Sequence, residues 1–285
     1  MDNPDVFESV FKRAIRQSYE HCDIRLDTIL LVTDLDPKDI AAYESKVRQL
    51  FGAILPSGKS RWISLHKHNY IGWAHLRAHI ERHEPSLIVT YRLLQEVHDN
   101  TKSSLGAFLD TMARALRIPV LVLPDPDGET AIRPGAACGS VMVVTSHLCG
   151  AHSLVNYGVR FTAEGGELTF CHLEDQDIFD RYLAAIEKIP EISTDVAREH
   201  IRRQLLVEPR QYIESVTQIL QKRRPDIRVQ GVIEIGHIID RCRELIRTRE
   251  ADFVILALND AAHLAMPGAG YSLAVELKDI PLLLV

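Results

Sequence analysis

The sequence predicts an α/β fold built on a parallel sheet, and three observations point to it. Segments with strand and helix patterns alternate along the chain. The strand segments are continuous apolar runs, such as residues 28–33, which is typical of strands buried on both faces. The third observation is an internal repeat. Residues 118–123 (IPVLVL) and 280–285 (IPLLLV) are near copies, and Gly106 precedes the first by the same spacing as Gly268 precedes the second.

The repeat predicts two related domains that differ in length. We expect an N-terminal helical extension at 1–26, a first domain at 27–124, a linker at 125–139 and a second domain at 140–285. The linker is rich in Pro, Gly and Asp, which favour turns and irregular structure. In the extension, apolar residues recur with a helical period from Val6 to Tyr19.

In the first domain, the predicted elements alternate strand and helix. The strands are expected at 28–33, 61–66, 87–91 and 120–123, and the helices at 40–54, 71–83 and 105–116. The pair Asp36-Pro37 is typical of the turn that starts a helix. Pro85 indicates the end of the helix before the third strand.

The second domain repeats this pattern with more residues. Strands are expected at 141–145, 168–172, 228–234, 253–257 and 282–285, and helices at 148–162, 178–223, 238–249 and 271–278. The long helical region is expected to break near Pro190 and again near Pro209, because proline lacks the N–H that a helix needs. The second unit is longer by roughly 50 residues, about one long helix and one strand. We therefore expect four strands in the first domain and five in the second.

Composition narrows the function classes. The chain has 285 residues and a net charge of −6, without the basic excess that nucleic-acid binding needs. No apolar run approaches the roughly 20 residues that cross a bilayer, and the first residues do not resemble a signal peptide. The five cysteines are scattered without CxxC spacing, which fits reduced thiols. We expect a cytoplasmic protein with no nucleic-acid partner and no membrane insertion.

Several phrases, taken in order, resemble the universal stress protein family in its tandem form. They are residues 29–34 (ILLVTD), 229–236 (VQGVIEIG), 251–256 (ADFVIL) and the two Ile-Pro endings. The resemblance covers roughly residues 27–285. It implies two Rossmann-like (adenine nucleotide alpha hydrolase-like) open parallel sheets in strand order 3-2-1-4-5, the first shortened to four strands, with a ligand crevice at the carboxyl ends of the central strands. Family dimers pair their last strands antiparallel, so the strands after Pro119 and Pro281 are candidates to pair within this chain as a pseudo-dimer.

The same resemblance implies a nucleotide site that this sequence keeps only in part. Nucleotide-binding members carry G-x-x-G after the fourth strand, followed nine residues later by G-S or G-T, and an Asp after the first strand. The first domain keeps Asp34, but its corresponding loop, residues 91–97, is bulky and has no glycine. A side-chain cap of the local loop is an equally good reading of Asp34. We expect no nucleotide here.

In the second domain, Ser146 stands where the Asp would be, and Ala257 and Asp260 fall near the two glycine positions. The residues that remain are in the segment 267–272. Its Gly268, Gly270 and Ser272 could form a small anion nest at a helix start. The alternative is a tight turn that needs glycine for a positive φ.

Two further groups of residues have side chains of the kinds that bind metals or act as nucleophiles. The histidines His75, His79 and His83 are four residues apart and share one helical face, a spacing that can ligate Zn²⁺. The alternative is a solvated or interface-facing side of the helix, and no metal is expected. Cys149 lies near histidines in sequence, but no acid that would orient a base can be named, so catalysis is not expected there.

The hypothesis that follows is a non-catalytic stress-response or regulatory module with degenerate ATP-binding motifs. It would act through an unidentified protein partner or small ligand, without a cofactor, and further homo-oligomerisation stays open. One alternative is an ATP- or AMP-binding protein that uses the Gly268–Ser272 turn. Another is a regulatory module of a cation/proton antiporter.

Overall fold

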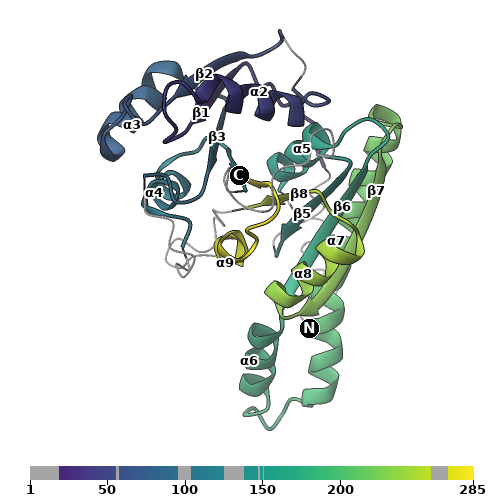
Figure 1. Ribbon diagram of the computed structural model, residues 1–285. Helices are drawn as coiled ribbons and strands as arrows, with labels where there is room; N and C mark the ends of the chain where they lie inside the picture. The colour runs from purple at the N-terminus through teal and green to yellow at the C-terminus, as the bar shows by residue number, and fades with distance from the viewer. Residues whose placement is uncertain are drawn as a thin grey trace.

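The computed structural model describes residues 19–55, 58–95, 104–124, 138–146, 148–149, 151–257 and 269–285. The helix expected over residues 6–19 lies almost wholly outside these residues, as does most of the expected linker at 125–139. Residues 19–26, the described end of the expected extension, have no regular secondary structure. The chain forms one mixed α/β layer structure around a nine-stranded sheet (Figure 1).

The first half contains four strands, as predicted. Its elements are β1 (Thr28–Val32), α2 (Ile40–Leu50), β2 (Arg61–Leu65), α3 (Gly72–His83), β3 (Leu87–Tyr91), α4 (Ala107–Ala115) and β4 (Val120–Leu123). The strands are parallel and lie in the order β2-β1-β3-β4. Both β3 and β4 are buried along their whole length, which explains their uninterrupted apolar sequences.

The second half contains five strands, also as predicted. Its elements are β5 (Ser140–Thr145), α5 (His152–Phe161), β6 (Glu167–Asp175), α6 (Gln176–Ile186), α7 (Thr194–Arg223), β7 (Arg228–Gly236), α8 (Ile238–Thr248), β8 (Phe253–Leu256), α9 (Ala269–Glu276) and β9 (Leu282–Leu284). The order in the sheet is β9-β8-β5-β6-β7, all parallel. If the strands of the second half are numbered from β5 as strand 1, their order in the sheet is 5-4-1-2-3.

The two halves are joined into one sheet. Strand β4 pairs antiparallel with β9, with Val120 opposite Leu284 and Val122 opposite Leu282. Each of these apolar strands would otherwise be an exposed sheet edge, so pairing them removes two edges at once. This is the internal pairing that the family resemblance suggested. It places the chain end in the middle of the molecule (Figure 1).

The helical region between β6 and β7 differs from the prediction at one proline. The break near Pro190 is real, because α6 ends at Ile186 and α7 begins at Thr194. The predicted break near Pro209 is wrong, since α7 runs through it. A proline inside a helix removes one backbone hydrogen bond. The residues that follow it, including Tyr212 and Val216, are buried against the sheet, and this packing stabilises the helix.

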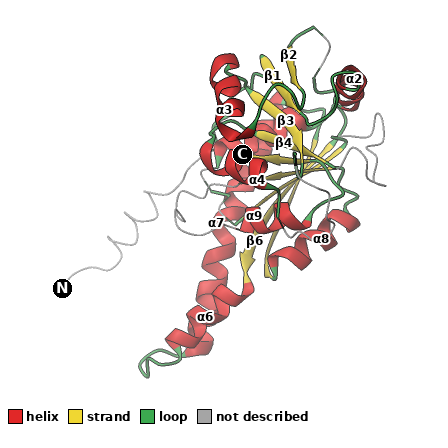
Figure 2. Cartoon of the chain, turned by 60° about the vertical axis from the view of Figure 1, so that its left-hand side comes forward, coloured by secondary structure: helices red, strands yellow, loops and turns green. Residues whose placement is uncertain are grey.

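Helix α6 and the first part of α7 form a hairpin that projects from the body of the molecule (Figures 1 and 2). Phe179 and Leu183 of α6 are buried, whereas Ile178 and Tyr182, on another face of that helix, are exposed. At 30 residues, α7 is the longest of the helices that the structure describes. No helix within the described ranges has the length and apolar character that a membrane span requires.

Candidate functional site

The place to look for a ligand site is the carboxyl end of the parallel strands, where the strand order reverses. In the first half this point lies between β1 and β3, and in the second half between β5 and β8. Asp34 follows β1, and Ser146 directly follows β5. Both therefore lie at the expected edge of the sheet.

In the first half, the Asp34 carboxylate is used inside the protein. The Tyr91 hydroxyl donates a hydrogen bond to one of its oxygens, and the backbone N–H of Gln95 donates to the other at 2.7 Å. The backbone N–H of Asp34 in turn donates to the Tyr91 hydroxyl at 3.0 Å. These contacts tie the loop after β1 to the loop after β3. We call them the Asp34–Tyr91–Gln95 cluster.

Bulky side chains fill the space beneath this cluster. Tyr70, Tyr91 and Leu94 are each 1% exposed. The Tyr70 hydroxyl donates to the Thr33 carbonyl at 3.0 Å. Burial raises the pKa of both tyrosines, so they remain neutral hydrogen-bond donors. The first crevice is thus closed by the chain's own side chains.

In the loop after β3, two residues other than glycine have a positive φ. Leu93 has a φ of 57° and Gln95 a φ of 58°, in the left-handed region that side chains other than glycine rarely adopt. Gln95 is held there by its bond to Asp34 and by its side-chain amide, which donates to the Tyr70 carbonyl at 3.3 Å. The sequence predicted a bulky loop in place of bare phosphate-binding backbone, and the described residues 91–95 agree.

In the second half, the predicted ligand-binding residues do not form a described site. Gly270 and Ser272 lie in the first turn of α9, while Gly268 and the loop before it lie outside the described residues. No hydrogen bond between described atoms joins Ser146 to either α9 residue. A side chain at Gly270 would place its Cβ 2.1 Å from the Ala257 carbonyl oxygen. Gly270 is therefore needed where α9 packs against the end of β8.

The pair His172 and Glu174 on β6 is not among the residues that the sequence predicted for the site. His172, in register with Thr145, is 3% exposed, and its Nε2 lies 2.9 Å from a carboxylate oxygen of Glu174. Its Nδ1 is buried without a hydrogen-bond partner in the described part of the chain. The signal that could have revealed the pair is the polar ending of an apolar strand, residues 168–175 (LTFCHLED).

The three histidines of α3 lie on that helix, as predicted, but do not converge. His75 Nδ1 accepts the Ile71 backbone N–H at 3.4 Å, and His79 Nε2 lies 3.0 Å from the Asn69 carbonyl oxygen. His79 and His83 stack with ring centroids 6.0 Å apart. Within the described ranges there is no group of three or more metal-ligating side chains. His75 and His79 thus serve as local hydrogen-bond partners of residues just before α3, and His83 stacks on His79.

Cys149 is in a poor environment for a nucleophile. Burial, with a smaller effect of Glu208, raises the pKa of its thiol to about 11, so it is protonated at neutral pH. The ring of His152 is engaged elsewhere, with its Nδ1 3.0 Å from the Tyr212 hydroxyl. His147 lies outside the described residues. All five cysteines of the chain are free thiols.

No protein-family model and no curated protein matches the chain. Solved structures that match it include a universal stress protein from Archaeoglobus fulgidus DSM 4304, at 13% identity over 90% of this chain and 97% of that one, with a TM-score of 0.49. A protein of unknown function from Pseudomonas aeruginosa PAO1 matches at 10% identity over 91% and 92%, with a TM-score of 0.48. The hypothetical protein MJ0577 matches at 14% identity over 53% and 96%, with a TM-score of 0.41. Matches this remote do not define a function.

Proposed function

We propose that the chain is a tandem regulatory module of the universal stress protein type, which acts in the cytoplasm through contacts with other proteins and does not turn over nucleotide. The observation that carries the proposal is the closed first crevice. There the family's acidic residue, Asp34, bonds to Tyr91 and Gln95 of the same chain. A ribose or phosphate would have to displace these groups to enter.

The second half supports the proposal by what its sequence lacks. Ala257 and Asp260 fall near the positions where nucleotide-binding members carry glycines. An aspartate there disfavours phosphate by charge repulsion. Gly270 has a packing role against the end of β8, so its presence is not evidence for a phosphate site. Both halves keep a parallel sheet, shortened by one strand in the first, whereas the features that bind phosphate are reduced in both.

Calorimetric titration of the purified full chain with ATP and with AMP tests the proposal. We expect no saturable heat at millimolar nucleotide and no nucleotide released when the purified protein is denatured. Hydrogen exchange with and without ATP adds a local measurement, because a ligand in the second crevice would slow exchange near Ser146 and α9. Stoichiometric ATP in the purified protein, saturable binding, or ATP hydrolysis at enzyme-like rates would each refute the proposal.

A further inference from the structure

The nine-stranded sheet has two free edges, and they are built differently. One edge is β2, which has five residues and is partly covered, because the Arg48 guanidinium lies 4.6 Å from the ring centroid of Trp62. The other edge is β7, which has nine residues. Long exposed edges are normally protected by charged side chains, especially lysine, by proline or by a bulge. Strand β7 contains no lysine or proline and pairs with β6 in continuous register, so its protection is limited to the charged side chains of Arg228 and Glu234.

The backbone of β7 offers unpaired hydrogen-bonding groups on its outer side. Arg228 donates its N–H to Gly166 at 2.9 Å, toward β6. Successive residues of a strand direct their backbone groups to opposite sides. The N–H and C=O groups of Val229, Gly231 and Ile233 therefore point away from β6, toward solvent. These are the groups that an added strand would use.

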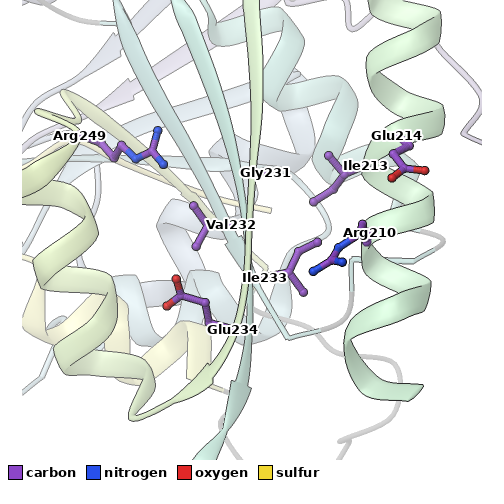
Figure 3. Close-up of a pocket in the computed structure, with 8 residues that line it drawn as sticks. All are labelled: Arg210, Ile213, Glu214, Gly231, Val232, Ile233, Glu234 and Arg249. Carbon is purple, nitrogen blue, oxygen red and sulfur yellow. The ribbon is translucent and has the colours of Figure 1, made fainter. Parts of the chain in front are cut away.

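A groove of about 460 Å³ runs along this edge (Figure 3). Arg210, Ile213 and Glu214 of α7 line one side, and Arg249, just after α8, lines the other. At the middle of the edge, Gly231 is exposed, and a Cβ there would lie 3.0 Å from Ile213. The missing side chain at Gly231 therefore leaves room for Ile213 of α7 to pack on β7.

The sequence of β7 is complementary to itself when read in the opposite direction. In an antiparallel pair centred on Gly231, Val229 would face Ile233 of the partner subunit, so two apolar side chains would meet. Arg228 would face Glu234 of the partner subunit, and the two-fold symmetry would make this charge pair twice. Cross-strand pairs of both kinds stabilise antiparallel sheets. The outward-facing residues also face each other in this register, as the hydrogen-bonding pattern requires.

We propose that β7 is a homodimerisation edge, at which a second copy of this chain adds its own β7 antiparallel about a two-fold axis through Gly231. The sheet then continues from one subunit into the other. The occupant of the groove is thus a copy of the surface that forms it.

The charged side chains at the edge are placed to serve this contact. The Arg228 side chain is 72% exposed, and its Nε lies 3.7 Å from a carboxylate oxygen of Glu167. Glu234 is held in place by Arg241, whose Nη2 donates to it at 2.9 Å. Dimerisation would therefore bring Arg228 to a carboxylate that is already ordered, which lowers the entropic cost of the new pair.

A charge-swap experiment tests this register. Sedimentation equilibrium of the wild-type chain should show a dimer of the 32.2 kDa subunit that dissociates on dilution. Arg228→Glu and Glu234→Arg should each raise the dissociation constant about tenfold or more, because each turns two attractive pairs into repulsive ones. An equimolar mixture should recover a mixed dimer in native mass spectrometry, since opposite charges then face each other at both positions.

The control is Arg198→Glu, an equal change of charge on the exposed part of α7, which should leave the dissociation constant unchanged. Hydrogen exchange of the wild-type chain gives a readout that needs no variant. The amides of Val229, Gly231 and Ile233 should exchange more slowly as protein concentration rises. A monomeric wild-type chain, an edge occupied only by a different protein, a dimer protected on another surface, or a mixture that stays monomeric would each overturn the proposal.

Discussion

Replacing Asp34 with alanine should destabilise the first half of the molecule. The substitution removes the acceptor for the Tyr91 hydroxyl and for the Gln95 N–H. Hydrogen bonds to a charged acceptor contribute about 1.5–3 kcal/mol each. Asp34 is half-buried, so solvent screening reduces this value. We expect the free energy of unfolding to fall by about 2–3 kcal/mol for Asp34→Ala and by about 1–2 kcal/mol for Tyr91→Phe.

Urea unfolding followed by circular dichroism measures these changes, with the midpoint as readout and the slope as a check on two-state behaviour. Asp39→Ala is the matched control, because Asp39 is exposed, lies in the same segment and makes no side-chain capping bond. Its effect should stay within about 0.5 kcal/mol. The double variant at positions 34 and 91 should lose less than the sum of the single losses, since both remove the same contact. If Asp34→Ala behaves like Asp39→Ala, the Asp34–Tyr91–Gln95 cluster does not hold the loops together.

Four further predictions concern other parts of the molecule. Asp252→Ala should lower the free energy of unfolding by about 3 kcal/mol in urea titration, because its carboxylate accepts the backbone N–H groups of residues 138–140. Arg92→Leu should lower the free energy of unfolding by about 2 kcal/mol in the same titration, because the buried guanidinium donates to two carbonyls at the end of α9, one at 2.6 Å. An unchanged free energy of unfolding would show that this contact between the halves is dispensable. Iodoacetamide at pH 8 should modify exposed Cys22 well before Cys149, read by mass spectrometry. In the folded chain the pKa of Cys149 is raised from 9.0 to about 11, so as the pH rises the thiol ionises first in the unfolded chain. The free energy of unfolding should therefore fall between pH 9 and 11. Cys149→Ala should make this fall with pH less steep.

The strands and most helices could be predicted because their signals are local. An apolar run such as β3, residues 87–91, is buried on both faces, and its sequence alone indicates this. The helix through Pro209 could not be predicted, because its stability depends on packing against a strand that comes later in the chain. The Asp34–Tyr91 bond joins residues 57 positions apart. Only the fold brings them together, so the sequence could suggest a local cap for Asp34 but not its partner.

The candidate site in the second half was less predictable for a related reason. Ser146 was placed correctly at the end of β5, since strand ends follow from the apolar pattern. His172 comes from another strand, and the register between β5 and β6 places it opposite Thr145, the residue before Ser146. Register between parallel strands is set by packing across the whole sheet and leaves little trace in either strand alone.

The antiparallel pair of β4 and β9 has a kinetic and evolutionary consequence. In a dimer of separate chains, such a contact dissolves on dilution, whereas here both strands belong to one polypeptide and meet at a fixed effective concentration. The interface between the halves is therefore independent of protein abundance. It also frees each half from symmetry. Tyr91 in the first crevice needs no counterpart in the second, so the two ends of one sheet can differ in sequence and packing.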